Sequence, residues 1–485
     1  MDTATPAPRP LATLRTGART ALATTGLGLL LAPPAAAAPE PAEAGTDVRA
    51  YLQQVADDQQ LPGLAVAVVD GDSVGTHMIA EDGDGAAMSE STPFLLGSVS
   101  KSVTATAVLD LAAADELTLD DRLGDLLPEH GIADERADDI TVQQLLTHTA
   151  GLTTADGLAH ADRFDTASGA LQRQATGLDD VTLARDPGAG YEYSDLGYLL
   201  LGAIVEEQAG APFAEVVTDR VLAPAGVEQV VADEASAEAL PPGHRQVLGR
   251  PVAFDTRYDT SGAPYGYLGT DLDGAAAWAR AQLGGGGIDE ATLAELHTAR
   301  VQTGSGDAYG YGWRVGEQDG HSLVEHTGAT PGYFSHVRVQ PERDRAVVVL
   351  ANSYSEARAG ALYDVAGDVQ RILDGEQPQR SGADPVLAGA PFAVLGLSVV
   401  GVLAALAALR RGTPTRVLVL VAGVLLTALA LVAPSLLGYT SAQLRLWAPD
   451  LGWGLWAVVA TWSVAGLTAA VAMVRRRGRG RDAAG

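Results

Sequence analysis

The sequence of 485 residues contains no cysteine and a single lysine, Lys101, against 31 arginines. The missing thiols exclude disulfide bonds, thiolate catalysis and cysteine-based metal sites. A domain without disulfide bonds needs a full hydrophobic core, and a chain of this length can supply one. Most histidines also lack the spacing of metal ligands, and we interpret these as surface or packing residues: His77, His130, His160, His244, His297, His321 and His336.

Acidic charge is concentrated in the middle of the chain. Residues 385–485 carry nine arginines and two aspartates, and residues 1–38 carry three arginines and one aspartate. The formal charge of −28 therefore leaves −37 for residues 39–384. Such a surface repels phosphate groups, which argues against nucleic acid or anionic lipid as a partner.

Residues 1–38 have the layout of a secretory signal peptide. Arg9, Arg15 and Arg19 precede or open an apolar run that ends near residue 31, and small residues follow it, as at a cleavage site. An uncleaved signal anchor has the same layout. In both cases the domain that follows is predicted to be exported.

Three uncharged apolar runs lie near the other end, at residues 386–409, 417–437 and 451–474. Each is long enough to cross a hydrocarbon layer of ~30 Å at about 1.5 Å per residue. Clusters of arginine lie between the first two runs and after the third, and such clusters favour the cytoplasmic side. They are Arg410, Arg411, Arg416, Arg475, Arg476, Arg477, Arg479 and Arg481.

This charge pattern predicts a linker at residues 381–385, a three-helix transmembrane anchor at 386–474 and a basic cytoplasmic tail at 475–485. The domain at residues 39–380 is then extracellular. Trp447, Trp453 and Trp456 are predicted at the outer interface, where aromatic residues gather.

The exported part has strand patterns at both of its ends and helical patterns between them. Residues 47–57 predict a short helix, and residues 64–70 and 73–80 predict a hairpin. Residues 335–340 and 346–351 predict two strands joined by a polar turn. The order of elements indicates an α+β domain whose terminal strands share one sheet.

The single lysine stands three residues after Ser98, at the start of an alanine-rich helix predicted to run to about residue 115. Residues i and i+3 share a helix face, and a desolvated lysine can lose its proton, which arginine cannot. Helix N-termini also favour developing negative charge. The pair predicts a serine nucleophile with its base and half of an oxyanion site.

Two further segments could carry chemistry. Tyr193 and Asp195 lie in a tyrosine-rich turn before a helical run at residues 199–208, and a phenol near an ammonium group can have a lowered pKa and act as a base. The other segment runs from His326 through Thr327, Gly328 and Ala329 to Gly332, between two predicted strands. A glycine in this segment lets a substrate lie close to the strand edge, and the Ala329 N–H could complete an oxyanion hole. Packing and a plain turn are the alternatives.

In this order, Ser98-x-x-Lys101, Tyr193-x-Asp195 and His326-Thr327-Gly328 resemble the serine β-lactamase and penicillin-binding protein superfamily. The resemblance covers about residues 47–375 and is closest to the class C β-lactamase-like group, which includes D-alanyl-D-alanine carboxypeptidases, D-amino-acid peptidases and esterases. Segments 141–152 and 310–313 also fit. The resemblance implies an antiparallel sheet flanked by helices, with a mostly helical lobe.

By this resemblance Ser98 is the acylated nucleophile, Lys101 its partner and Tyr193 the catalytic tyrosine. His326, Thr327, Gly328, Ala329 and Asp195 bind the substrate or the oxyanion, and no metal or organic cofactor is needed. Asp195 replaces the usual asparagine and His326 the usual lysine. We expect Asp195 to favour protonated Lys101 and to shift base duty to Tyr193. The two departures argue against efficient β-lactam hydrolysis and leave an ester or a peptide as substrate.

The sequence therefore predicts a membrane-anchored extracellular serine hydrolase that acts through an acyl-enzyme on an amide or ester. Its substrate is a small molecule or peptide, cell-wall-derived compounds included. One alternative is a binding or sensor module in which Asp195 has impaired turnover, although the only lysine stands beside Ser98. A second is a transporter or channel, but the three apolar runs contain no acid or base for a relay.

Overall fold

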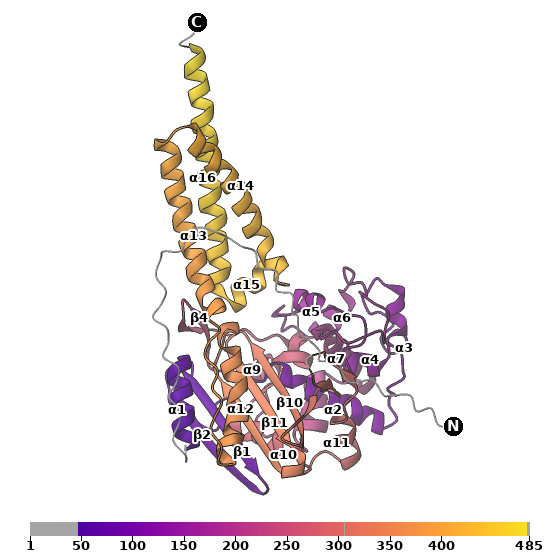
Figure 1. Ribbon diagram of the computed structural model, residues 1–485. Helices are drawn as coiled ribbons and strands as arrows, with labels where there is room; N and C mark the ends of the chain where they lie inside the picture. Colours follow the sequence, from indigo (N-terminus) through magenta and orange to yellow (C-terminus); the bar gives the residue numbers. More distant parts are fainter. Residues whose placement is uncertain (1–46, 305, 483–485) are drawn as a thin grey trace, which may run out of the picture. The chain divides into compact units, whose positions relative to one another are not determined.

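The computed structural model describes residues 47–304 and 306–482 (Figure 1). The signal peptide predicted at residues 1–38 lies outside the described residues. The described residues belong to one compact unit, which contains both the sheet domain and the C-terminal helices.

The centre of this unit is an eight-stranded antiparallel sheet in the order β2-β1-β12-β11-β10-β9-β8-β7. Its strands are β1 Gly63–Asp70, β2 Ser73–Ala80, β7 Val301–Gln302, β8 Ala308–Tyr309, β9 Arg314–Gln318, β10 His321–Thr330, β11 Tyr333–Gln340 and β12 Arg345–Ala351. Strand β1 pairs with β12 from Leu64 opposite Ala351 to Asp70 opposite Arg345. This pairing confirms that the terminal strands of the domain share one sheet.

Two small sheets complete the strands. One pairs β3 with β6, and the other has the order β13-β4-β5. Their bounds are β3 Phe94–Leu95, β4 Gly243–Val247, β5 Arg250–Phe254, β6 Gly269–Thr270 and β13 Ser353–Tyr354.

Helices cover both faces of the large sheet (Figure 1). Along β12, Val347 and Val349 belong to the hydrophobic cluster under helices α1 Val48–Gln59 and α12 Ala359–Leu373. Val348 and Leu350 belong to the cluster under α2 Ser100–Ala113 and α10 Leu272–Ala281. Successive side chains of a strand point to opposite faces, and a strand buried on both faces needs a continuous apolar run.

The remaining helices of the domain form the predicted helical lobe. They are α3 Leu123–Leu126, α4 Val142–Leu146, α5 Thr154–His160, α6 Ala170–Thr176, α7 Asp195–Ala209, α8 Phe213–Val217, α9 Glu234–Ala237 and α11 Glu290–Leu296. Short 3-10 or π turns are η1 Gly97–Val99, η2 Glu135–Asp139, η3 Thr218–Leu222, η4 Thr260–Gly262, η5 Ala263–Tyr267, η6 Pro341–Arg343 and η7 Glu356–Arg358. Helix α7 is buried continuously from Leu196 to Val205, because α2, α4, α5, α6 and α8 all pack against it.

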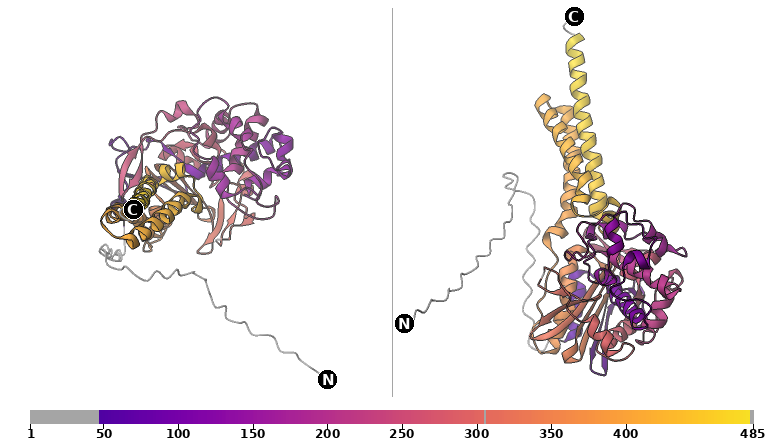
Figure 2. Two further views of the ribbon diagram at one scale, coloured as in Figure 1. Left: turned by 90° about the horizontal axis from the view of Figure 1, so that it is seen from above. Right: turned by 90° about the vertical axis from the view of Figure 1, so that its right-hand side faces the viewer.

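The three predicted apolar runs form helices α13 Pro385–Arg410, α14 Thr413–Leu436 and α16 Pro449–Asp482, and all three are long and apolar enough to cross a membrane. Figure 2 shows them side by side, with α16 packed against both others. A Cβ on Gly423 would come within 2.7 Å of the Trp462 carbonyl oxygen, so a glycine allows the close approach of α14 and α16. A short helix that was not predicted, α15 Ser441–Trp447, stands between α14 and α16.

Truncation of Leu350 tests the packing of the sheet. This side chain is fully buried in β12, so we expect Leu350→Ala to lower the free energy of unfolding by about 2–5 kcal/mol. Val74 on β2 is 46% exposed, and Val74→Ala should change stability by less than about 0.5 kcal/mol. The unfolding midpoints of the full chain in detergent check both values, and equal losses would contradict the assignment of the core.

Candidate active site

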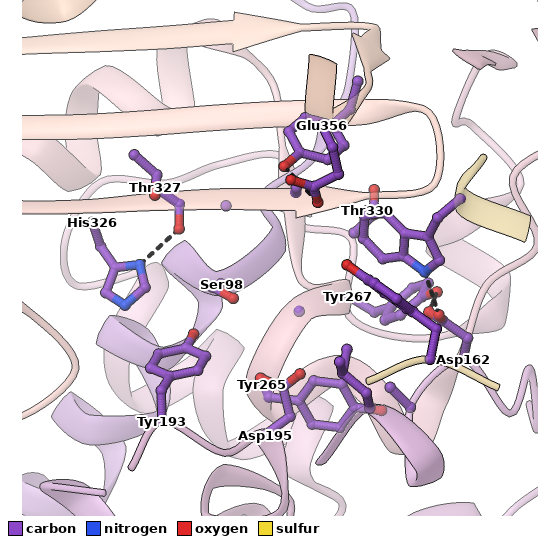
Figure 3. Close-up of a pocket in the computed structure, with 18 of the residues that line it drawn as sticks. Ser98, Asp162, Tyr193, Asp195, Tyr265, Tyr267, His326, Thr327, Thr330 and Glu356 are labelled. Carbon is purple, nitrogen blue, oxygen red and sulfur yellow. Dashed lines mark hydrogen bonds between the residues drawn. The ribbon is translucent and has the colours of Figure 1, made fainter. Parts of the chain in front are cut away.

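Ser98 lies in the turn η1, immediately before helix α2. The predicted helix thus begins later than its sequence pattern indicates, at Ser100. Gly97 has a φ of +50°, and a Cβ on it would come within 2.2 Å of the Ala329 nitrogen. Glycine is the residue that tolerates both conditions. The turn therefore sets Ser98 directly against strand β10, as Figure 3 shows.

Lys101 is completely buried and its amine contacts three groups. Its Nζ donates to Ser98 Oγ at 3.0 Å and to the Tyr265 carbonyl at 2.8 Å, and it lies 2.7 Å from Asp195 Oδ1. The i, i+3 spacing thus brings Ser98 and Lys101 together, as predicted. The Tyr265 carbonyl was not predicted, because a backbone acceptor in η5 leaves no signal in residue types.

Burial lowers the pKa of Lys101 below its ordinary value, and the negative charge of Asp195 acts in the opposite direction. The expectation from the sequence considered Asp195 alone and concluded that Lys101 would stay protonated. Desolvation outweighs that attraction, because a buried ammonium loses its hydration. The neutral amine therefore forms at lower pH than in a free lysine, and a neutral amine can act as the base for Ser98.

The predicted lowering of the Tyr193 pKa is wrong. Its ring lies 4.9 Å from Lys101 Nζ, but burial and then the charge of Asp195 raise the pKa of the phenol well above its usual value, against the effect of a hydrogen bond with Ser98. Figure 3 shows its hydroxyl facing Ser98. A phenol that stays protonated is suited to donate a proton rather than to abstract one.

His326 lies inside strand β10, which corrects the prediction that its segment connects two strands. Burial and the charge of Lys101 lower the pKa of His326 to about 3, so the ring is neutral. Its Nδ1 donates to the Thr327 carbonyl at 2.7 Å and its Nε2 accepts from Tyr309 at 3.2 Å. The position therefore offers a substrate no fixed positive charge.

The residues after His326 pack on the serine turn. A Cβ on Gly328 would lie 2.0 Å from the Leu96 carbonyl oxygen and 2.6 Å from the Ser98 nitrogen. Together with the contact between Gly97 and Ala329, this places the backbone amides of Ser98 and Ala329 beside one another. Two backbone N–H groups held by rigid elements are what an oxyanion hole requires.

These side chains line a cleft of about 260 Å³. Its wall contains all the predicted site residues except the buried Lys101, together with others that no motif indicated: Asp162, Tyr265, Tyr267, Arg314, Glu356, Tyr363, Tyr439 and Trp447. The last two come from the segment between α14 and α16. Trp447 was predicted only at the membrane interface, and no sequence pattern indicated that it lines the site.

The buried ring of His148 packs against three tyrosines at the site. Its ring lies 4.3 Å from that of Tyr193, 4.7 Å from Tyr309 and 5.2 Å from Tyr198, centroid to centroid. Its Nδ1 accepts from the Ser194 N–H at 3.2 Å, and burial lowers its pKa well below the usual value. A neutral ring packed in this way fixes the position of Tyr193. Among residues 47–304 and 306–482, no group of three or more histidines or carboxylates could hold a metal ion.

Residues 48–370 match the family model described as Beta-lactamase. The chain is 31% identical over 342 residues to penicillin-binding protein 4 of Amycolatopsis lactamdurans, covering 66% of this chain and 86% of that protein. It is 25% identical over 281 residues to Protein flp of Staphylococcus aureus strain MW2, covering 55% of this chain and only 54% of that protein.

Among solved structures, the D-amino acid amidase of Ochrobactrum anthropi SV3, complexed with L-phenylalanine amide, superposes with a TM-score of 0.57. Its sequence is 23% identical, and the match covers 68% of this chain and 98% of that chain. This likeness concerns the fold, and it confirms the predicted antiparallel sheet with its helical lobe.

Replacement of Asp195 tests the balance of charges at Lys101. Because the charge of Asp195 raises the pKa of Lys101, Asp195→Asn should lower that pKa further. The neutral amine then forms at lower pH. The rising limb of the pH profile of acylation by a fluorophosphonate should therefore shift to lower pH.

The exposed Asp186, which pairs with Arg136 outside the cleft, provides a matched control in Asp186→Asn. Its profile should coincide with that of the unaltered chain. A limb that stays in place or moves to higher pH in Asp195→Asn would show that Lys101 is not the titrating group.

Proposed function

Since this chain belongs to the beta-lactamase family, whose members act on amides and esters as serine hydrolases, we propose that Ser98 forms an acyl-enzyme with such a substrate. The observation that carries the proposal is the 3.0 Å contact between Ser98 Oγ and the buried amine of Lys101. An activated serine needs a base within hydrogen-bond reach, and this base has a lowered pKa.

In the first step Lys101 takes the proton of Ser98, and Oγ attacks the substrate carbonyl. The backbone N–H groups of Ser98 and Ala329 hold the resulting oxyanion. As the intermediate collapses, Tyr193 gives its proton to the leaving alcohol or amine and recovers one from the Lys101 ammonium. Water then attacks the acyl group, Ser98 regains its proton, and the net reaction adds one water to yield a carboxylic acid and an alcohol or amine.

The neutral His326 and the paired Asp195 favour an ester or amide whose recognition does not depend on a carboxylate at β10. This supports an esterase or peptidase over an efficient β-lactamase. Cell-wall-derived peptides remain within this class. A binding module of the same fold is the alternative, and it predicts a folded chain whose Ser98 does not react.

We further propose that residues 39–380 form the hydrolase domain outside the cell, held by α13, α14 and α16. The support is the apolar length of these helices and the arginines at residues 410, 411 and 416 and beyond 474, which favour the cytoplasm. The linker at 381–385 and the tail at 475–485 belong to the same proposal, as does a signal peptide at 1–38.

Intact mass of the full chain in detergent tests the nucleophile. Incubation with a fluorophosphonate should add one adduct per chain, and Ser98→Ala should slow this reaction by at least about 10³-fold. Ser73→Ala, at the exposed start of β2, should react as the unaltered chain does. A parallel incubation with a penicillin separates penicillin-recognising peptidases from esterases. A folded chain that reacts with neither reagent would contradict the proposal and favour the binding module.

The absence of cysteine makes the orientation testable with single introduced thiols. In intact cells a membrane-impermeant maleimide should label Val74→Cys, on the surface of the hydrolase domain. It should label Gly412→Cys, between α13 and α14, only after the membrane is permeabilised. Labelling of Gly412→Cys in intact cells would reverse the proposed topology.

A further inference from the structure

A second cavity, of about 330 Å³, adjoins the catalytic cleft. The two share four wall residues, which are Tyr354, Glu356, Tyr439 and Trp447. We name this cavity the apolar pocket, because aliphatic and aromatic side chains make up most of its wall. Its volume lies within the range of ~300–1,000 Å³ that small-molecule sites occupy.

The wall between cleft and pocket is held by the segment that connects α14 to α16. Trp447 Nε1 donates to Asp162 Oδ2 at 2.8 Å, and the indole meets the Tyr354 ring edge-on at 5.9 Å. On either side, Arg245 donates to the Leu446 carbonyl at 3.0 Å and Asp450 accepts from a backbone N–H of the hydrolase domain at 2.7 Å. The anchor thus contributes directly to the active-site wall.

The far side of the pocket belongs to the membrane helices. Leu387 and Pro391 come from the start of α13, Leu437 follows the end of α14, and Leu451 comes from the start of α16. Only two residues separate α13 from α14, so these helices are antiparallel and all four side chains lie at one end of the bundle. Leu387 is 46% exposed and Leu437 58% exposed, so the apolar wall of the pocket reaches the protein surface at this end of the bundle, which is the outer end under the proposed topology.

We propose that the apolar pocket holds a hydrocarbon chain of the substrate, so that the hydrolase acts on an amphiphilic ester or amide drawn from the membrane. The inference rests on the proposed function, because the occupant's carbonyl must reach Ser98. A chain that leaves the bilayer for an apolar pocket remains out of water. Its carbonyl then lies in the polar cleft, beyond Glu356 and Trp447, which line both cavities.

Chain-length selectivity of the full chain in detergent tests the proposal. With p-nitrophenyl esters, each methylene buried in the pocket should raise kcat/KM by up to roughly fourfold. Octanoate should therefore exceed acetate by at least about tenfold. Ala388→Trp fills the pocket from α13 and should reduce the octanoate-to-acetate ratio by about tenfold or more, whereas Ala393→Trp, exposed on the same helix outside the pocket, should retain it.

An equal ratio in the unaltered chain and in Ala388→Trp would overturn the proposal, as would the absence of chain-length preference in the unaltered chain. Turnover of neither ester, with no reaction at Ser98, would overturn the proposed function instead. The ratio is measured within each variant, so a general loss of activity does not imitate the expected result.

A second measurement needs no variant. A fluorophosphonate with a medium-length alkyl chain that ends in a diazirine should first react at Ser98 and then, on illumination, cross-link to residues 385–391 and 437–451. Cross-links found only elsewhere in the chain, with Ser98 labelled, would overturn the pocket assignment and leave the proposed function intact. The same cross-linking pattern is expected if a bilayer lipid or a detergent molecule, and not the substrate chain, occupies the pocket.

Discussion

The arrangement of this site depends on the burial of one amine, the side chain of Lys101. Lys101 is the only lysine of the chain, it is excluded from solvent, and its Nζ lies between Ser98 Oγ, the Tyr265 carbonyl and Asp195. Helix α2 carries it into the core, where it packs against helix α7 and the turn η5. Burying an ammonium group without polar partners costs free energy. Asp195 and the Tyr265 carbonyl compensate its charge, and Ser98 Oγ is the group that exchanges a proton with the amine.

Burial of the neighbouring side chains also determines the character of the cleft. It raises the pKa of Tyr193 and lowers that of His326, so both side chains are neutral beside a lysine that can also become neutral. A site of this kind does not select its substrate by a fixed charge on β10. Shape and apolar contact must contribute more, which agrees with the apolar pocket that adjoins the cleft and is lined partly by the long apolar helices.

Sequence patterns predicted those features that depend on local order along the chain. The apolar run at residues 64–70 indicated β1, and the i, i+3 spacing of Ser98 and Lys101 indicated their contact, because both follow from the repeat of one element. The three long apolar helices were predicted in the same way, from the length of their apolar runs. That the terminal strands share one sheet was predicted from the order of elements, but the direct pairing of β1 with β12 was not.

Features that depend on burial were not predicted. The pKa of Tyr193 was expected to fall, because a lysine is close, but the surrounding protein reverses the direction. The segment from His326 was expected to lie between two strands, with its glycine leaving room for a substrate, yet Gly328 lies in β10 and its missing side chain allows contact with the serine turn. Nothing in the sequence relates Trp447 to Asp162, 285 residues away.

The most direct test is the titration of Lys101 itself. Because the chain has one lysine, protein labelled with ¹³Cε-lysine gives a single side-chain resonance whose shift reports its protonation. The midpoint should lie below the ordinary 10.5 and should fall further in Asp195→Asn. A midpoint at or above 10.5 would show that the ion pair with Asp195 outweighs burial, and it would remove Lys101 as the base for Ser98.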